Sequence, residues 1–216
     1  MGMKTNHNAM DEYVMVLPAD SLWKAGYFQG LTFAIERYMH LIKDKNKTIV
    51  LKRKDVETDA NYKQIIPYAI FFHGGKIFSY RRGKLLEEKR LLGDYSIGIG
   101  GHISSYDDNL FMETYEHGML REIYEEVRIS SSYSQHLVAM INDDTNEVGR
   151  VHFGIVHMFY LNQAEVEPKE KSINEGRFVS ILNLKSNIDK YENWSQICIQ
   201  NIDNLIEFNK RLEMGR

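Results

Sequence analysis

The order of hydrophobic and polar positions along the chain predicts a series of short strands. Such runs of apolar residues, rich in Val, Ile, Tyr and Phe, are typical of strands that are buried in a sheet. They occur at residues 13–17, 68–72, 76–80, 95–99, 138–141, 151–161 and 177–181. The chain therefore carries enough strands for a sheet of several members.

A tight turn joins two of these strands. Gly74 and Gly75 follow His73 and separate residues 68–72 from residues 76–80. Glycine adopts positive φ without a steric penalty, as the two-residue turns of antiparallel hairpins require. We expect a β-hairpin at this point.

Helical spacing of apolar residues marks three further segments. It extends from Phe28 to Ile42, from Met112 to Val127, and from Glu192 to Met214. Strands interleaved with helices of this kind predict an α/β fold. We expect an α/β/α sandwich, in which helices cover both faces of a mixed sheet.

The pattern weakens in residues 43–61, which are charged and carry one short apolar run. We place a domain boundary there. Residues 1–61 are expected to form an N-terminal extension of a strand and an amphipathic helix, and residues 62–216 the main domain with its C-terminal helix. The apolar stripe of the extension needs a partner surface, on the sheet or on a second subunit.

Composition narrows the cellular setting. A net charge of −3 gives no reason to expect a nucleic acid or an acidic membrane as partner, and the basic runs at residues 52–54 and 81–84 are interpreted as solvated loops. The first ten residues are polar and no segment approaches the length of a membrane span, so we expect a cytoplasmic protein. Cys198 is the only cysteine, which excludes an intrachain disulfide and a thiolate zinc cluster.

Three carboxylates crowd one face of the second predicted helix. At roughly 100° per residue, Glu122, Glu125 and Glu126 share one side of that helix. Like charges three or four positions apart repel each other and weaken a helix, and a bound divalent cation removes the repulsion. Closely spaced oxygen ligands favour Mg²⁺ (or Mn²⁺) over zinc. We therefore predict a magnesium or manganese site on this face.

These carboxylates belong to a longer pattern of charged and aliphatic residues with fixed spacing. Its members are Glu113, Arg121, Glu122, Ile123, Glu125, Glu126 and Ile129. The pattern resembles the box of the Nudix hydrolase family (MutT-like), G-x5-E-x7-R-E-U-x-E-E-x-G-U, in which U is aliphatic. The resemblance extends over residues 65–185 and implies a Nudix-type α/β/α sandwich with an enzyme activity, the Mg²⁺-dependent hydrolysis of phosphorus-containing anhydrides.

Two positions depart from the family pattern. Gly101 precedes Glu113 with eleven residues between them, where the family has five, and Asp107 stands at the nominal glycine position. We interpret the difference as a six-residue insertion at residues 104–109. Arg128 replaces a glycine that commonly ends the helix in a left-handed conformation, and a non-glycine residue in that conformation costs about 1 kcal/mol.

The resemblance assigns roles to the box residues. The three helical carboxylates are the metal ligands, and Arg121 orients one of them through an ion pair that suits the fork shape of guanidinium. Glu113 supports the site, and Gly101 lies in a loop that often contributes a backbone carbonyl to the metal. A diphosphate repels a nucleophile, so its hydrolysis needs positive charge on the phosphate oxygens and an activated water, which Mg²⁺ supplies.

The general base and the residues that bind phosphate come from several candidates. In some family members the base is a box glutamate, here Glu122. In others it is a glutamate from a later loop, for which Glu175 is the first candidate and Glu170 the second. The arginines that could bind substrate phosphates are Arg81, Arg82 and Arg90.

Three histidines lie near these motifs. His152 and His157 are five positions apart in one predicted strand, so they face opposite sides of the sheet and cannot bind one ion together. His102 follows Gly101, and we interpret it as a structural residue that forms hydrogen bonds.

Taken together, these features predict a Mg²⁺-dependent pyrophosphatase that cleaves a diphosphate bond in a nucleoside diphosphate linked to another moiety. The resemblance also suggests a homodimer. One alternative is an enzyme like isopentenyl-diphosphate isomerase, although that branch relies on a cysteine in a strand and Cys198 lies in the closing helix. A second alternative is a non-catalytic nucleotide sensor, a class that usually loses box carboxylates and gains a DNA-binding domain.

Overall fold

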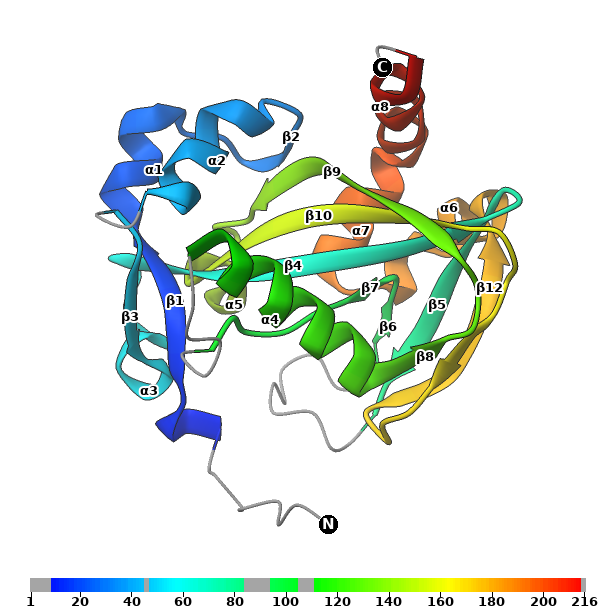
Figure 1. The fold of residues 1–216 in the computed structure, drawn as a ribbon, viewed down its shortest axis with the longest axis horizontal. Helices are drawn as coiled ribbons and strands as arrows, with labels where there is room; N and C mark the ends of the chain where they lie inside the picture. Colours follow the sequence, from blue (N-terminus) through cyan, green and yellow to red (C-terminus); the bar gives the residue numbers. More distant parts are fainter. Residues whose placement is uncertain (1–8, 45–46, 84–93, 105–110, 215–216) are drawn as a thin grey trace.

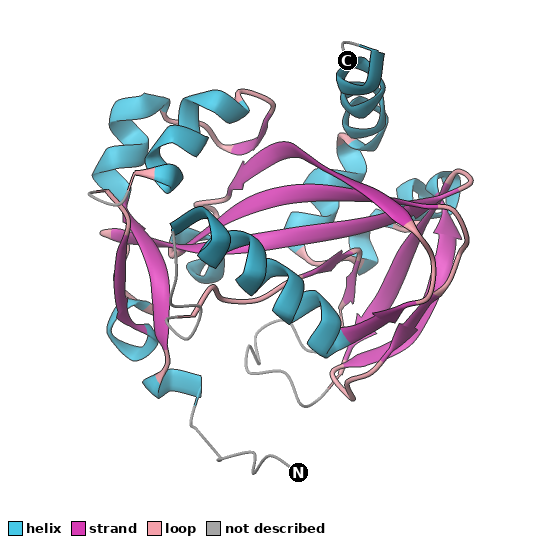
Figure 2. Ribbon diagram, viewed as in Figure 1, coloured by secondary structure: helices cyan, strands magenta, loops and turns pink. Residues whose placement is uncertain are grey.

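One mixed sheet runs through the molecule, with helices on both of its faces (Figures 1 and 2). The structure, a computed structural model, describes residues 9–44, 47–83, 94–104 and 111–214. The strands of the sheet are β1 (Tyr13–Pro18), β2 (Gly30–Thr32), β3 (Ile49–Lys52), β4 (Tyr62–His73), β5 (Lys76–Arg82), β6 (Tyr95–Ser96), β7 (Gly98–Ile99), β9 (Tyr133–Asn142), β10 (His152–Leu161) and β12 (Ile173–Ser180). The α/β sandwich with a mixed sheet is confirmed.

The helices are distributed along the whole described chain. They are α1 (Ala19–Gly26), α2 (Ile35–Lys43), α3 (Arg53–Val56), α4 (Phe111–Glu126), α5 (Glu147–Arg150), α6 (Ile181–Ser186), α7 (Asn193–Gln200) and α8 (Ile202–Met214). A small second sheet pairs β8 (Val127–Ile129) with β11 (Val166–Pro168). Helix α4 crosses in front of the sheet in Figure 1, whereas α7 lies behind it and α8 projects beyond its upper edge in this view.

Strand β4 is the centre of the sheet. The order along the sheet is β12-β5-β4-β10-β9-β2, and β4 runs parallel to β10 while the other neighbours in this order are antiparallel. The predicted hairpin between β4 and β5 is confirmed, because Gly74 and Gly75 have φ angles of 54° and 76°.

Alternation along β4 divides the core between the two faces. Ile70 belongs to the cluster that contains Ile202 of α8, and its neighbour Phe71 belongs to the cluster that contains Met119 and Ile123 of α4. Successive side chains of a strand point to opposite faces, so one strand can hold both helical layers. Burial of each such side chain stabilises the fold by about 1.5–3 kcal/mol. This packing fixes α4, and with it the box carboxylates, against the sheet.

The N-terminal extension joins the same sheet. Strand β1 pairs with β3 and with the start of β4, and the Met15 amide donates a hydrogen bond of 2.9 Å to the Ile103 carbonyl. The predicted strand at residues 13–17 is therefore confirmed. The division at residue 61 stays a prediction, with β1 hydrogen-bonded across it.

Two long predicted helices were wrong in extent. The stripe from Phe28 to Ile42 is interrupted, because Gly30 has a φ angle of 87° and Leu31 pairs with strand β9. Only the second half of the stripe is helical, where it forms α2. The closing helix is likewise divided, into α7 and α8, with the helix cap of α7 at Asn201.

The expected left-handed residue at the end of α4 was also wrong. Strand β8 begins directly after Glu126, and Arg128 pairs in that strand with Glu167 of β11. Among the described non-glycine residues, only Glu175 has a positive φ, at 54°. An extended residue needs no glycine, so Arg128 introduces no backbone strain here.

Candidate active site

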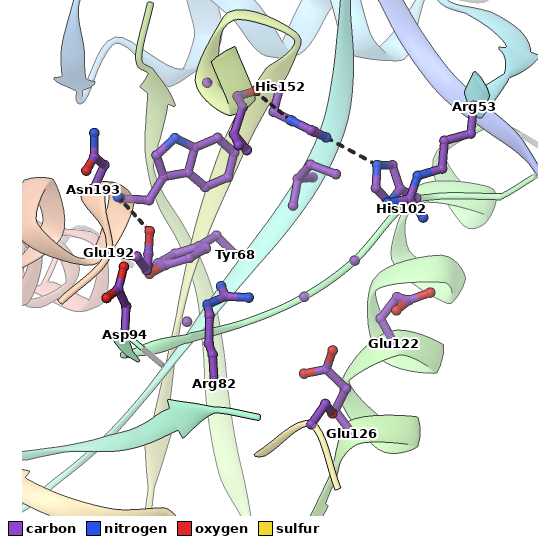
Figure 3. Close-up of a pocket in the computed structure, with 18 of the residues that line it drawn as sticks. Arg53, Tyr68, Arg82, Asp94, His102, Glu122, Glu126, His152, Glu192 and Asn193 are labelled. Carbon is purple, nitrogen blue, oxygen red and sulfur yellow. Dashed lines mark hydrogen bonds between the residues drawn. The ribbon is translucent and has the colours of Figure 1, made fainter. Parts of the chain in front are cut away.

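The box carboxylates lie where α4 passes the loop that contains Gly101 (Figure 3). A Cβ atom on Gly101 would lie 2.2 Å from Oε2 of Glu122, so a side chain there would displace the carboxylate. A Cβ atom on Gly100 would lie 1.8 Å from the Pro67 carbonyl oxygen. The two glycines therefore let the loop pack between β4 and α4 and bring its backbone against a box glutamate.

A cavity of about 710 Å³ opens beside this contact. Its walls come from α4, the glycine loop, β4, β5, α5 and the starts of β10 and α7. Its charged lining residues are Glu12, Arg53, Arg82, Asp94, Arg121, Glu122, Glu125, Glu126, Glu147, Glu170 and Glu192. Carboxylates outnumber guanidinium groups in this lining, which favours a cation in the cavity.

Two of the predicted metal ligands are poorly hydrated carboxylates. Burial raises the pKa of Glu126 to about 8, with a further increase from Glu122 and an opposing effect from the Arg82 guanidinium. Burial also raises the pKa of Glu122 to about 7, against the opposing charge of Arg121. A negative charge on these side chains is therefore unfavourable unless a cation compensates it. Oxygen-only donors with this need fit a hard divalent ion.

Arg121 connects α4 to the glycine loop. Its Nη1 lies 2.7 Å from Glu122 Oε1 and 3.6 Å from Glu125 Oε2. Its Nη2 donates to the His102 carbonyl at 3.4 Å and to Ser104 Oγ at 3.3 Å. The geometry suits the predicted orienting role of Arg121, which stays a prediction.

Arg82, and not Arg81, lines the cavity. The Arg82 Nε is buried and has no hydrogen-bond acceptor in the described part of the chain, and its guanidinium lies 6.0 Å from the ring centroid of Tyr80. Arg81 is exposed, with Nη1 3.5 Å from Glu175 Oε1. Arg90 lies outside the described residues.

The later glutamates are separated in the same way. Glu175 sits at an irregularity of β12, where Tyr95 donates a 2.8 Å hydrogen bond to Oε2, and this bond lowers the pKa of the exposed carboxyl. It is absent from the cavity lining, whereas Glu170 is part of it. Ser172 donates to Glu170 Oε2 at 3.2 Å. The structure thus brings the second candidate, Glu170, to the box carboxylates and leaves Glu175 outside.

Glu113 lies on α4, but its side chain is outside the described part of the structure. Residues 105–110, which contain most of the predicted insertion, lie wholly outside the described residues.

Two histidines meet at the edge of the cavity. His152 Nδ1 lies 2.7 Å from the Val148 carbonyl oxygen, and the Nε2 atoms of His152 and His102 are 3.3 Å apart. Burial lowers the pKa of His102 well below its usual value, so the ring is neutral at pH 7. His102 forms hydrogen bonds, as expected. His157 instead lies with its Nε2 2.8 Å from the Tyr115 hydroxyl of α4.

An aromatic wall closes the cavity near α7. The rings of Tyr68 and Trp194 meet edge to face with centroids 5.7 Å apart. Glu192 caps the helix: it accepts from the amides of Trp194 and Ser195 at 2.8 and 2.9 Å and from the Tyr68 hydroxyl at 2.8 Å. The carboxylate of Glu192 thus has a structural role, as the N-cap of α7 and as the acceptor of the Tyr68 hydroxyl.

Comparisons with known proteins agree with the fold. No protein-family model matches the chain. Protein YmaB of Bacillus subtilis (strain 168) is 33% identical over 199 residues, which cover 88% of this chain and 97% of YmaB. The chain belongs to the YmaB family.

Solved structures place this YmaB-family chain in the Nudix fold. Tm1382, described as a candidate Nudix hydrolase, has a TM-score of 0.77 and 27% identity, over 90% of this chain and 100% of its own. DR0079 from Deinococcus radiodurans has a TM-score of 0.53 and 14% identity, over 72% of this chain and 90% of its own, and shares the fold.

In this YmaB-family chain the N-terminal extension contributes to the cavity, which sequence reasoning missed. Glu12 and Arg53 line it, and Arg53 is only 5% exposed although residues 52–54 were expected to be a solvated run. Its Nε donates to Glu57 Oε2 at 3.3 Å. No local sequence pattern predicts that Arg53 is buried in the cavity wall, because this contact depends on β1 and β3 joining the sheet. The match with YmaB covers 88% of the chain and therefore includes part of the extension.

Helices in the described part of this YmaB-family member do not combine the length and the apolar character that crossing a bilayer requires.

Proposed function

We propose that the chain is a Mg²⁺-dependent hydrolase (with Mn²⁺ as a substitute) that cleaves a diphosphate bond in a nucleoside diphosphate linked to another moiety. The observation that carries the proposal is the meeting of Glu122 and Glu126, both with raised pKa, with Glu170 and Arg82 in one cavity. The cavity therefore combines carboxylate ligands for a metal ion with an arginine, Arg82, for the phosphate of a substrate. The similarity to Tm1382 supports the hydrolase class.

The metal would be held by Glu122, Glu125 and Glu126. When bound, Mg²⁺ neutralises charge on the phosphate oxygens and supplies an acidified water. The raised pKa values of two of these carboxyls support this assignment, because they show how unfavourable the negative charges are without a cation. We assign Arg121 to holding the Glu122 and Glu125 carboxylates in place through its two contacts of 2.7 and 3.6 Å.

Arg82 is the proposed phosphate-binding residue. The buried Nε of Arg82 has no acceptor in the described part of the chain, which favours an anionic ligand, since an unsatisfied buried donor is costly. Arg81 is proposed to have no such role, because it pairs with Glu175 at the exposed sheet edge.

Glu170 is the proposed general base. It would accept a proton from the attacking water through a carboxylate oxygen, and its place in the cavity lining beside Glu126 supports this role. Glu175, which ranked first on sequence grounds, is held by Tyr95 outside the cavity. Glu122 is kept as a ligand.

The nucleoside part of the substrate is proposed to lie against Trp194. This ring lines the cavity next to Tyr68, and aromatic faces stack on nucleobases with about 1–3 kcal/mol per base. An isomerase of the isopentenyl-diphosphate type is disfavoured, because Cys198 is buried in the core cluster with Ile199 and does not line the cavity.

The test is a panel of nucleotide sugars, dinucleotides and nucleoside triphosphates, each incubated with Mg²⁺ and the wild-type chain. We expect two phosphorylated products from at least one nucleoside diphosphate compound. The Glu126→Gln variant should turn over at least about 1,000-fold more slowly, which corresponds to a barrier raised by about 4 kcal/mol through the loss of a metal ligand.

The same panel separates a hydrolase from a sensor. Binding of a nucleotide to the wild type, measured by calorimetry, without cleavage above the rate of an enzyme-free control, would replace the hydrolase by a non-catalytic nucleotide sensor. Substrate cleavage that is equal in both proteins would exclude the box carboxylates from the chemistry.

A further inference from the structure

A second group of metal-binding side chains lies at the edge of the cavity, apart from the box carboxylates. Glu57 follows α3, His102 follows the glycine pair, and His152 begins β10. One potential ligand atom from each of the three lies within 4.8 Å of the others. Figure 3 shows the two imidazole rings facing each other across the cavity edge.

The hydrogen bond to Val148 fixes the state of the His152 ring. A backbone carbonyl oxygen only accepts, so His152 Nδ1 carries the proton and donates it over 2.7 Å. In the neutral form of this ring the lone pair is therefore on Nε2, the atom that faces His102. In histidines that bind metals, the N–H of the other ring nitrogen almost always donates a hydrogen bond in this way, which orients the ligand atom.

The spacing of the two nitrogens fits a shared ion. Two imidazole nitrogens at about 2.0–2.1 Å from a tetrahedral ion are separated by close to the observed 3.3 Å. A hydrogen-bonded histidine pair would have the same spacing, so the third group matters. Glu57 adds a carboxylate within reach of both rings. The carboxylate is itself positioned by Arg53 Nε at 3.3 Å and Gln64 Nε2 at 3.4 Å.

We propose that Glu57, His102 and His152 bind one transition-metal ion of the Zn²⁺ type. Two imidazoles and one carboxylate are a known donor set of zinc sites that keep a fourth position open. Both histidines line the cavity, so the open position faces the space in which a substrate would lie. The ion would hold a water there or bind an anionic oxygen. This nitrogen-containing set differs from the oxygen-only box, which favours Mg²⁺.

Arg53 is the main opposing charge. Its guanidinium is 6% exposed and interacts with Glu57, so it reduces the attraction of the site for a cation. The donor set of two imidazole nitrogens and one carboxylate nevertheless favours Zn²⁺-type ions over Mg²⁺. We therefore expect the site to bind Zn²⁺ and Co²⁺ and not to bind Mg²⁺ at millimolar concentration.

The test is a titration of the full, metal-free chain with Co²⁺, followed by visible absorption. We expect one equivalent to give the bands of a four-coordinate nitrogen-containing site, and Zn²⁺ to displace it. His102→Gln and His152→Gln should each weaken binding by more than the roughly 10- to 100-fold loss that follows removal of an outer-shell partner. His40→Gln, which changes an exposed histidine of α2, is the matched control and should bind as the wild type.

Three outcomes of these measurements would contradict the proposal. Equal Co²⁺ affinity in wild type, His102→Gln and His152→Gln would leave a hydrogen-bonded pair only. Loss of the signal in Glu126→Gln instead would place the ion at the box. If the histidine variants fail to fold by circular dichroism, X-ray absorption of the wild type with one equivalent of Zn²⁺ decides: imidazole scattering is expected, and oxygen-only coordination would overturn the proposal. No substrate is used, so the result is independent of the hydrolase proposal.

Discussion

The two proposed metal sites of the cavity are built in contrasting ways. Glu122, Glu125 and Glu126 come from adjacent turns of α4, whereas His102 and His152 are 50 positions apart and meet a glutamate from the N-terminal extension. Helical spacing brings the first group together before any tertiary contact forms. The second group exists only after the sheet has assembled. Sequence periodicity can therefore reveal the box and cannot reveal the histidine group.

Outside the three proposed metal ligands, the largest effect is expected at the proposed general base. Glu170→Gln should lower kcat by about 100-fold or more, because it removes the proposed proton acceptor and positioned bases contribute about 10²–10⁴-fold. Glu175→Gln should stay within about threefold of wild type, since its carboxylate lies outside the cavity. Steady-state rates on the substrate identified in the panel measure both. The reverse order would restore Glu175 as the base.

A second comparison asks which arginine neutralises the substrate. Arg82→Gln should raise KM or lower kcat/KM by roughly 10- to 100-fold, as expected for the loss of a hydrogen bond to a charged group. Arg81→Gln should have little effect, because it breaks only an exposed pair at 3.5 Å. If Arg81→Gln proved the more damaging variant in the same assay, the phosphate site would have to move to the sheet edge.

A third expectation concerns pH and separates the acidic side from the histidine side. Without metal, the raised pKa of Glu126 means that the folded state holds a proton which the unfolded state releases at lower pH. The stability that this proton contributes is full below about pH 4.5 and is lost as pH rises through about 8. Thermal unfolding should show Tm falling over this window.

Mg²⁺ should reverse that loss, with a larger rise in Tm at pH 8 than at pH 6, because the ion replaces the proton. Glu126→Gln should weaken both the pH dependence and the Mg²⁺ response, and the part of the pH dependence that comes from Glu122 should remain. Glu165→Gln, at an exposed position, should retain both. A Mg²⁺ response that is the same in Glu126→Gln would contradict the assignment of the box as the Mg²⁺ site.

The smallest expected effect concerns Arg128. If this residue were left-handed, Arg128→Gly would stabilise the chain by about 1 kcal/mol. Because Arg128 lies in β8, the substitution should instead destabilise it by about 0.5–1 kcal/mol, through the greater chain entropy of glycine. Its exposed pair with Glu167 at 3.8 Å adds little. Chemical denaturation gives the sign, and a stabilised variant would contradict the extended geometry.

Local signals explain what the sequence could predict. The hairpin followed from Gly74 and Gly75, the strands from apolar runs, and the face of α4 from the spacing of its glutamates. Each of these depends on neighbours within a few residues. The expectation that Gly101 lies beside the site came instead from the resemblance to the Nudix box, and a Cβ atom at this position would lie 2.2 Å from Oε2 of Glu122.

Tertiary contacts explain what it could not. Arg53 belongs to a basic run, yet α3 packs it into the cavity wall beside Glu57. Glu170 and Glu175 are similar in sequence context, and the irregularity in β12 together with the Tyr95 hydrogen bond holds Glu175 away from the cavity. The interrupted helix near Gly30 depends on pairing between β2 and β9, which a helical pattern does not contain.

The most direct test of the central claim is Mn²⁺ binding by the metal-free chain, followed by electron paramagnetic resonance. The account predicts that wild type and His102→Gln bind Mn²⁺ equally, and that Glu126→Gln binds it at least about 10- to 100-fold more weakly because an oxygen ligand is removed. Equal Mn²⁺ affinity in Glu126→Gln and wild type would contradict the claim that the carboxylates of α4 form the catalytic metal site.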